Sequence, residues 1–384
     1  MTRREYLPFG KPNFSEQEII ALTRTLRSGW VGMGPETLAF EHELADYLEV
    51  PAVVTVNSCT SALFLSLLVS GVGPGDEVIC PSLTWCSTAN AALYLGATPV
   101  FCDIDPDTLC VTAEHVSSKL TSRTKAVTVV HFGGLAVDSG ALRAVLPQGI
   151  AIIEDAAHAF GARFETGKKV GSSGNLTCFS FYANKNLSTA EGGAVALFDP
   201  ALTQRLQSLR QHAMPLDAWK RFTNPRAILL SSSLSELGYK MNYTDLQASI
   251  GRVQLSRQSE FGSIRLDIAR RYVDGLKAVG LPLKFQDDCL HPYHARHLFV
   301  LQLPLERMSC GRDELLVTLR SKNIGATVHY SPLHLMPLYC GNAEAVHLPV
   351  TERVAKCIMT LPMSASMTLN DADYVIEQLH ESLK

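Results

Sequence analysis

A lysine, an acid and two hydroxyls follow three apolar segments of this 384-residue sequence. Lys185 stands in FSFYANKNLSTAEGGAVAL (179–197), where burial would lower the pKa of the amine and make it a nucleophile toward aldehydes. Asp155 ends the apolar run AIIED, and a carboxylate in such a place must be paired or become neutral. Thr60 and Ser61 open a helical pattern after the run AVVTV, and the free N–H groups of a helix N-terminus suit a phosphate.

Each of these segments also has a plain structural interpretation. Lys185 could be a surface lysine on a strand-to-loop turn, Asp155 a helix cap, and Thr60 and Ser61 an ordinary helix start. Taken together, however, they are the parts that pyridoxal phosphate needs. The lysine holds the aldehyde as a Schiff base, the acid keeps the pyridine nitrogen protonated, and the hydroxyls and N–H groups anchor the phosphate.

Two further residues are candidates for the same site. Trp85 follows another apolar run and could stack on the cofactor ring. His158 lies three residues after Asp155 and either faces the same space or has a structural role.

Short runs rich in Val and Ile alternate with helical patterns over the first half of the chain, and they predict the elements that position these residues. The runs are apolar on both faces and cover 52–56, 77–80, 98–101, 126–130 and 151–154. This alternation is typical of an α/β fold with a mostly parallel sheet covered by helices. Ligands of such sheets bind at the carboxyl ends of the strands, where the candidate residues lie.

The alternation of short apolar runs and helical patterns changes after about residue 255, and this change predicts a second, smaller domain. We expect a large cofactor-binding domain over 1–250 and a small C-terminal α+β domain over 251–384, with the segment 1–14 able to pack on the small domain. The small domain is expected to hold a strand at 297–303, a helix from Arg312, a short strand near Val328 and a terminal helix from about Asn370.

The composition of the chain argues against several classes of protein. With 46% hydrophobic and 18% charged residues and a net charge of −3, the chain is a packed globule without the basic surface that a nucleic-acid partner requires. No apolar run approaches the ~18 residues of a membrane span, and the start of the sequence does not resemble a signal peptide. Ten scattered cysteines without a CxxC pair predict free thiols and a cytoplasmic protein.

Several long motifs, in order along nearly the whole chain, resemble the DegT/StrS-type family of sugar aminotransferases. They include LRSGWVGMGPETLAFE, SCTSALFLSLL, PSLTWCSTANAALYLGATPVFCDID, IEDAAHAFGARF, CFSFYANKNLSTAEGGAVAL, LGYKMNYTDLQASIG and IGATVHYSPLH. Within that family LTW, EDAAHA and GYKMN are most similar to enzymes that make UDP-4-amino-4-deoxy-L-arabinose. The resemblance implies the type I aspartate-aminotransferase fold, with a sheet of the seven-stranded type.

The resemblance also implies roles for individual residues. Lys185 would be the Schiff-base lysine and proton shuttle, Asp155 the partner of the pyridine nitrogen, and His158 a neighbour of the cofactor. The remaining cofactor contacts would be Trp85 on the ring, Thr60, Ser61 and Ser180 on the phosphate, and Asn242 reaching the phosphate from the neighbouring subunit of a homodimer with shared active sites. Many relatives carry Asn at the position of Lys240, so the choice between Lys240 and Asn242 stays open.

The implied reaction moves an amino group, in two half-reactions, from glutamate to a nucleotide-linked keto-deoxy sugar, at C4 in preference to C3. Cations for the nucleotide diphosphate are available in Lys220, Arg221 and Arg226, although a solvated basic loop is the alternative. By the same resemblance His329 and His334 would lie near the substrate, with a structural role as the alternative. TLPMSASMT near the end departs from the family pattern, so the sugar preference is left open.

Other functions remain in view. A cyclitol transaminase, a sugar dehydratase and a cofactor-binding regulator share the cofactor, although family dehydratases replace the lysine and Lys185 therefore argues against that branch. An NAD-dependent oxidoreductase fits the alternating elements but lacks the glycine fingerprint. His291, His294 and His297 are spaced by three, but we expect no metal site because no cysteine or acid is adjacent.

Overall fold

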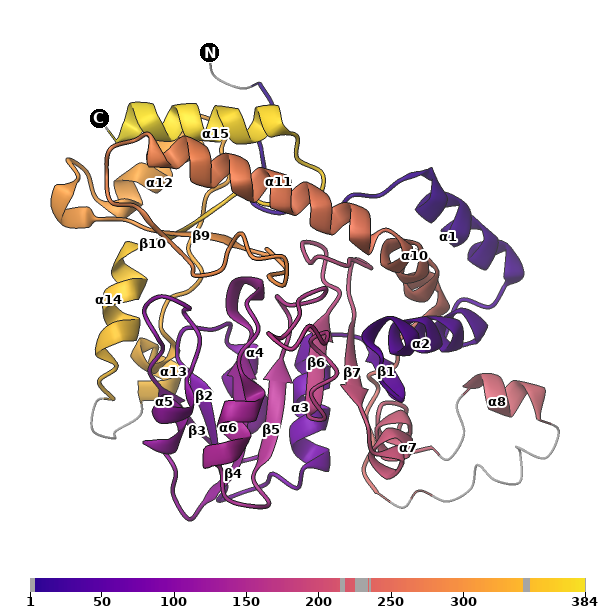
Figure 1. Ribbon diagram of the computed structural model, residues 1–384. Helices are drawn as coiled ribbons and strands as arrows, with labels where there is room; N and C mark the ends of the chain where they lie inside the picture. Colours follow the sequence, from indigo (N-terminus) through magenta and orange to yellow (C-terminus); the bar gives the residue numbers. More distant parts are fainter. Residues whose placement is uncertain (1–3, 215–217, 225–233, 235, 341–345, 384) are drawn as a thin grey trace.

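The larger part of the chain is built on a seven-stranded sheet, in a computed structural model that describes residues 4–214, 218–224, 234, 236–340 and 346–383 (Figure 1). In chain order the strands are β1 (Ala52–Val56), β2 (Glu77–Pro81), β3 (Thr98–Cys102), β4 (Thr124–Val130), β5 (Ala151–Asp155), β6 (Leu176–Ser180) and β7 (Gly193–Leu197). Their order in the sheet is β1-β7-β6-β5-β4-β2-β3.

All strands of this sheet except β7 point the same way. The pairs from β3 to β6 are parallel, whereas β7 is antiparallel to both β6 and β1. The carboxyl ends of β1, β4, β5 and β6 therefore share one edge with the first residue of β7. This edge collects the segments that carry the candidate residues.

Helices cover both faces of the sheet because both faces of its strands are apolar. Ile153 of β5 packs with α3 (Cys59–Val69), α4 (Ser87–Leu93) and α7 (Pro200–Leu209). On the opposite face Ile152 packs with α5 (Ala113–Ser117) and α6 (Ser139–Val145), and Val53 packs with α2 (Pro35–Leu48) and α10 (Asp245–Ser256). Alternation along each strand thus builds two cores.

A three-stranded antiparallel sheet forms a separate unit with its own core, in the upper part of Figure 1. Its strands are β8 (Lys284–Phe285), β9 (Phe299–Gln302) and β10 (Ile358–Leu361), and it packs against α11 (Gln258–Lys277), α12 (Arg312–Ser321) and α15 (Leu369–Ser382). The remaining helices of the described residues are α1 (Glu16–Ser28), α8 (Ala218–Thr223), α13 (Pro337–Cys340) and α14 (Pro349–Cys357), with 3-10 turns at Phe132–Gly134, Leu305–Arg307 and Leu333–Leu335.

The N-terminal segment contacts this second unit. The Leu7 N–H donates to the Asn323 carbonyl over 2.8 Å, and the Gly325 N–H donates to the Leu7 carbonyl over the same distance. The Phe9 carbonyl accepts from Met363 N–H over 2.9 Å. The division of the chain at residue 250 stays a prediction.

The strand pattern read from the sequence is confirmed, with shifts of a few residues at the ends. Every predicted run of the large sheet is a strand, and the run 297–303 contains β9. The prediction of a short strand near Val328 is wrong. That segment forms a single isolated bridge, Thr327 to Thr360, which is too short to count as a strand.

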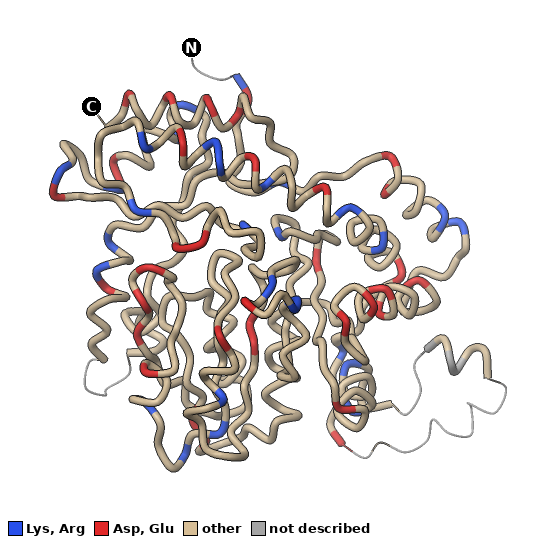
Figure 2. Tube along the Cα trace, viewed as in Figure 1, with Lys and Arg blue, Asp and Glu red and all other residues tan. Residues whose placement is uncertain are grey.

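Charged residues of both signs are interspersed along the chain (Figure 2). Several are paired, such as Arg252 with Glu43 at 2.6 Å and Arg271 of α11 with Asp373 of α15. All ten cysteines are free. Across the described ranges, no helix combines the length and the apolar character needed to cross a bilayer.

Candidate active site

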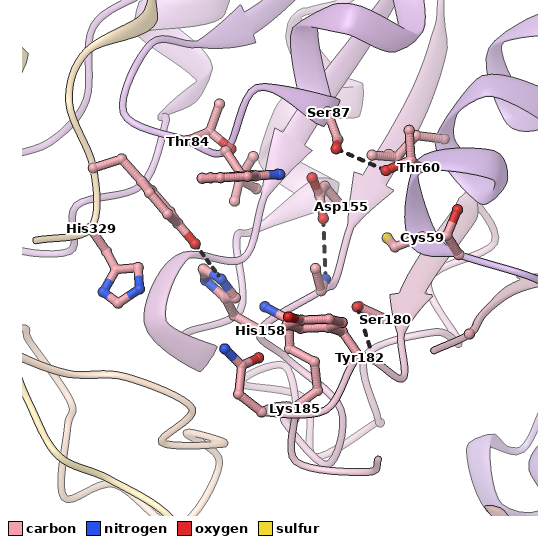
Figure 3. A pocket seen from close by; sticks show the side chains of 18 of the residues that line it. Cys59, Thr60, Thr84, Ser87, Asp155, His158, Ser180, Tyr182, Lys185 and His329 are labelled. Atoms are coloured by element: carbon pink, nitrogen blue, oxygen red, sulfur yellow. Dashed lines mark hydrogen bonds between the residues drawn. The ribbon is translucent and has the colours of Figure 1, made fainter. Parts of the chain in front are cut away.

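A cavity of about 410 Å³ lies at the shared carboxyl edge of the large sheet (Figure 3). It is bounded by the start of α3, the segment after β2, the ends of β4 to β6, the turn before β7 and the segment around Tyr330. Its size lies in the ordinary range for a small-molecule site. Its lining residues include Ser58, Cys59, Thr60, Thr84, Trp85, Ser87, Asp155, His158, Ser180, Tyr182, Asn184, Lys185, Gly192, His329 and Tyr330.

Lys185 reaches this cavity from the turn that follows β6, where its N–H donates to the Tyr182 carbonyl over 2.9 Å. Burial lowers the pKa of the amine to about 8, although Asp155 and Cys59 act in the opposite direction. Its Nζ lies 3.3 Å from Nε2 of His297. A lysine with such a pKa is often neutral near pH 8 and can attack an aldehyde.

Asp155 is the last residue of β5, and the side-chain alternation of the strand turns it toward the α3–α4 face. Its Oδ2 accepts from the Thr88 hydroxyl over 2.8 Å, and its Oδ1 accepts from the Ala157 N–H over 3.1 Å. Burial raises the pKa of this carboxyl, and these two hydrogen bonds oppose the rise. A cationic N–H entering the cavity would find a carboxylate that still has acceptor capacity.

Hydroxyl groups surround the start of α3. The Thr60 hydroxyl is 2.8 Å from that of Ser87 at the start of α4, and Ser180 ends the neighbouring strand β6. Gly193, the first residue of β7, lets the α3 start approach, because a Cβ there would lie 2.6 Å from the Cys59 nitrogen. The first N–H groups of α3 therefore stand at the cavity wall, which favours an anion.

Aromatic side chains form the opposite wall. Trp85 packs against Tyr330 with ring centroids 5.9 Å apart and is 60% exposed, so much of the indole is available for a further ring. Tyr330 shares a 3.0 Å hydrogen bond with Nε2 of His158. Burial, Lys185 and His329 hold the pKa of His158 well below its ordinary value, so the imidazole is neutral. Burial, followed by Lys185, lowers the pKa of His329 to about 3.

The structure therefore brings together seven of the predicted residues at one cavity: Thr60, Trp85, Asp155, His158, Ser180, Lys185 and His329. Ser61 does not line it. The hydroxyl of Ser61 donates to Asn57 Oδ1 over 2.7 Å, and its N–H donates to the N-cap Ser58, so this side chain stabilises the turn.

His334 was expected near the substrate, with a structural role as the alternative, and it lies away from the cavity lining. It is buried beside Ser82, with Nδ1 2.6 Å from that hydroxyl and Nε2 3.5 Å from Glu352. This histidine joins the 333–335 turn to the segment after β2 and does not line the cavity.

The remaining predicted residues lie outside this chain's cavity or outside the described residues. The Asn242 amide donates to the Tyr243 carbonyl over 3.0 Å, and neither Asn242 nor Lys240 lines the cavity. Lys220 and Arg221 fall in α8, which lies apart from strands β4 to β6 in Figure 1, and their side chains are not among those described. Arg226 lies outside the described residues.

Sequence reasoning did not single out several residues of this site, and three of these contact predicted residues. Thr88 donates to Asp155, Tyr330 contacts His158, and His297 contacts Lys185. In the sequence, His297 stands out only by its spacing of three from His294 and of six from His291, a possible metal pattern. No group of three or more His, Cys, Asp or Glu side chains suited to a metal occurs in the described parts of the chain.

The residues present fit pyridoxal phosphate. The cavity holds an amine for an aldehyde, a carboxylate for a ring nitrogen, a helix start with hydroxyls for a phosphate and an indole for a ring. One buried polar atom at the cavity, Oδ1 of Asn184, has no hydrogen-bond partner, so the site can serve a further donor.

Comparison with known proteins gives matches over the full chain. The profile described as the DegT/DnrJ/EryC1/StrS aminotransferase family matches residues 12–380. The spore coat polysaccharide biosynthesis protein SpsC of Bacillus subtilis is 40% identical over 388 residues, covering 100% of this chain and 98% of that protein.

Two solved structures illustrate the structural match. The aminotransferase TlmJ from Streptoalloteichus hindustanus is 34% identical, with a TM-score of 0.89 over 100% of this chain and 99% of its own. The putative sugar aminotransferase Spr1654 from Streptococcus pneumoniae, in its PMP form, is 30% identical, with a TM-score of 0.88 over 98% of this chain and 97% of its own.

Proposed function

This chain belongs to the DegT/DnrJ/EryC1/StrS aminotransferase family, and from that premise we propose that it is a pyridoxal-phosphate-dependent sugar aminotransferase. We propose further that it moves an amino group from glutamate to a nucleotide-linked keto-deoxy sugar, at C4 in preference to C3. The observation that carries the proposal is the amine of Lys185 in the same cavity as the buried carboxylate of Asp155. The names of two relatives support a sugar as the acceptor. SpsC is described as a spore coat polysaccharide biosynthesis protein and Spr1654 as a putative sugar aminotransferase.

The chain's own residues would act as follows. Lys185 Nζ would hold the cofactor through its aldehyde and, when free, would serve as the base that moves a proton at the donor carbon. Asp155 would keep the ring nitrogen protonated, Trp85 would stack on the ring, and His158 would lie beside it. Thr60, Ser180 and the first N–H groups of α3 would hold the phosphate, and Ser61 would act through the geometry of that turn. When bound, pyridoxal phosphate supplies a conjugated ring that accepts electrons as the donor carbon loses its proton.

The second subunit and the cell compartment are also proposals. Asn242 would reach the phosphate of the neighbouring subunit, so the enzyme would be a homodimer with shared sites. Lys220 and Arg221 would contact the nucleotide of the acceptor, and His329 would lie near its sugar. Ten free cysteines favour a reducing compartment, the cytoplasm.

One experiment tests this function. The purified protein, supplied with the cofactor and glutamate, is incubated with nucleotide-linked 3-keto and 4-keto sugars and with a keto cyclitol, and the aminated product is identified by mass and NMR. We expect amination of a 4-keto sugar and loss of the visible lysine–cofactor absorbance in Lys185→Ala. Lys185→Arg, which keeps the charge but is a poor nucleophile, serves as the control and should be equally inactive. Preferential amination of the cyclitol, or full activity of Lys185→Ala, would contradict the proposal.

A further inference from the structure

His297 lies against the lysine of the candidate site although it comes from the other half of the chain. It precedes β9 of the small sheet, and its Nε2 is 3.3 Å from Lys185 Nζ. Its ring is also 4.7 Å from that of His158, centroid to centroid. Because this buried histidine contacts the reactive amine, it can influence the direction in which the amine points.

Neighbouring hydrogen bonds assign the tautomer of His297. The Asn186 amide nitrogen donates to the Ala295 carbonyl over 2.9 Å, so its oxygen is the atom that faces His297 Nδ1 at 3.3 Å. An amide oxygen only accepts, and Nδ1 must therefore carry the proton. In a neutral ring this leaves the lone pair on Nε2, directed at Lys185.

The ring stays neutral in its surroundings. Burial, followed by the charges of Lys185, His158, Arg265 and His329, holds the pKa of His297 well below its ordinary value. Arg265 lies on α11, and its guanidinium donates to the Arg296 carbonyl over 3.1 Å. Toward Lys185 itself the charged or titratable neighbours are His297, Asp155, Cys59, His158 and His329. Nε2 can thus accept from the amine without competing for its proton.

We propose that His297 is a positioning residue for Lys185: its Nε2 accepts one N–H of the amine and thereby fixes the direction of the nitrogen lone pair. A neutral lysine has two N–H bonds and one lone pair, and rotation about the last carbon–nitrogen bond would otherwise average their directions. With one N–H held by His297, the lone pair can be kept toward the cofactor carbon for proton transfer. The proposal rests on the proposed function only for its kinetic part.

The contact itself is testable in the cofactor-free protein. A hydrogen bond to a neutral acceptor favours the ammonium form, so its removal lowers the pKa of the amine. We expect His297→Phe to lower the pKa of Lys185 by about one unit, measured as the pH dependence of its labelling by an amine reagent and quantified by peptide mass spectrometry. His297→Gln, which keeps an acceptor, should remain near the wild-type midpoint.

Matched variants separate this effect from disturbed packing. His294→Phe changes a buried histidine of the same segment that bonds to Gln286 instead of Lys185, and it should leave the midpoint unchanged. Asn186→Ala removes the acceptor that fixes the tautomer and should lower the midpoint in the same direction as His297→Phe. If His297→Phe does not fold, Asn186→Ala carries the test. If the pH midpoint of Lys185 labelling is unchanged or raised in these two variants, Lys185 does not donate a hydrogen bond to His297.

Kinetics test the positioning. In the cofactor-loaded enzyme we expect His297→Phe to slow the half-reaction with the amino donor about ten- to a hundredfold, with little change in the KM of the donor. The pH profile should shift downward together with the labelling midpoint, and His297→Gln should recover most of the rate. A loss confined to KM, or no recovery in His297→Gln, would overturn the role. If the wild type shows no half-reaction at all, the proposed function fails, whereas the labelling experiment still decides the contact.

Discussion

At the residue scale the central feature is a lysine whose pKa is lowered toward neutrality. Burial brings it to about 8 from an ordinary value near 10.5, and the protein carries the cost of this shift. Between these two pH values the unfolded chain binds more protons than the folded one, so stability rises with pH across that window. Below pH 8 both states are protonated and the full penalty is present.

Lys185→Met should therefore stabilise the cofactor-free protein at pH 7. We expect a gain of about 1–2 kcal/mol in the free energy of unfolding, less than the full pKa shift implies because the amine lines a cavity and is not enclosed by packed side chains. The gain should shrink between pH 8 and 10.5. Urea unfolding at pH 7 and pH 10 measures it, with Lys277→Met at an exposed site as the control. Equal gains at the two pH values would show that packing, not the charge of Lys185, is responsible.

At the element scale the close approach of α3 to β7 positions the end of the cavity that we assign to the phosphate. Gly193 pairs with Val56 of β1 and Ser180 of β6, and a Cβ on it would also lie 2.6 Å from the Ser58 carbonyl carbon. These neighbours are backbone atoms, which cannot rotate away as a side chain would. The glycine is thus required by space and not by its own dihedral angles.

Gly193→Ala should push the start of α3 away from the strand. We expect it to destabilise the protein by about 1–3 kcal/mol and to weaken cofactor binding at least tenfold, because the N–H groups of α3 leave their position. Gly262→Ala is the matched control. It lies in α11 with no atom near the added methyl group, so it should stabilise the helix by about 0.5–1 kcal/mol and leave the cofactor affinity unchanged. Wild-type affinity in Gly193→Ala would contradict the assigned phosphate position.

At the scale of the whole molecule the candidate site joins distant parts of the chain. Asp155 ends strand β5 and Lys185 lies in the turn after β6, whereas His329 comes from the segment that follows α12 (Figure 3). Tyr330 is adjacent to His329, and His297 precedes β9 of the small sheet. Any movement between these parts would change the contacts of the lysine. The proposed homodimer would add Asn242 from a second chain.

Subunit mixing tests the shared site. Lys185→Ala and Asn242→Ala are each expected to be nearly inactive, since every site of either homodimer lacks one group. After the two are unfolded and refolded together in equal amounts, half of the dimers are mixed, and each mixed dimer has one intact site. Activity should therefore recover to about a quarter of wild type. Recovery to no more than the sum of the two variants would contradict a contribution of Asn242 across the interface.

The layers of the fold and the chemistry of the strand ends could be predicted from local sequence patterns. Apolar runs such as 52–56 and 151–154 predicted the buried strands β1 and β5. The spacing of Ser15 and Glu18 is that of the capping box at which α1 begins. Because parallel strands end at a common edge, residues that follow them, such as Asp155 and Thr60, were predictable neighbours.

The contacts between side chains that are distant in the sequence depend on how the elements pack. Asp155 faces the cavity, whereas the adjacent acid Glu154 turns to the opposite face and contacts His131 at 3.3 Å. His297 is 112 residues from Lys185 in the sequence, and the turn before β9 brings the two side chains together. His334 is only four residues from Tyr330, but its hydrogen bond with Ser82 keeps it out of the cavity. Local propensity and periodicity fix an element and its faces, but long-range contacts depend on how whole elements pack, which no short stretch of sequence encodes.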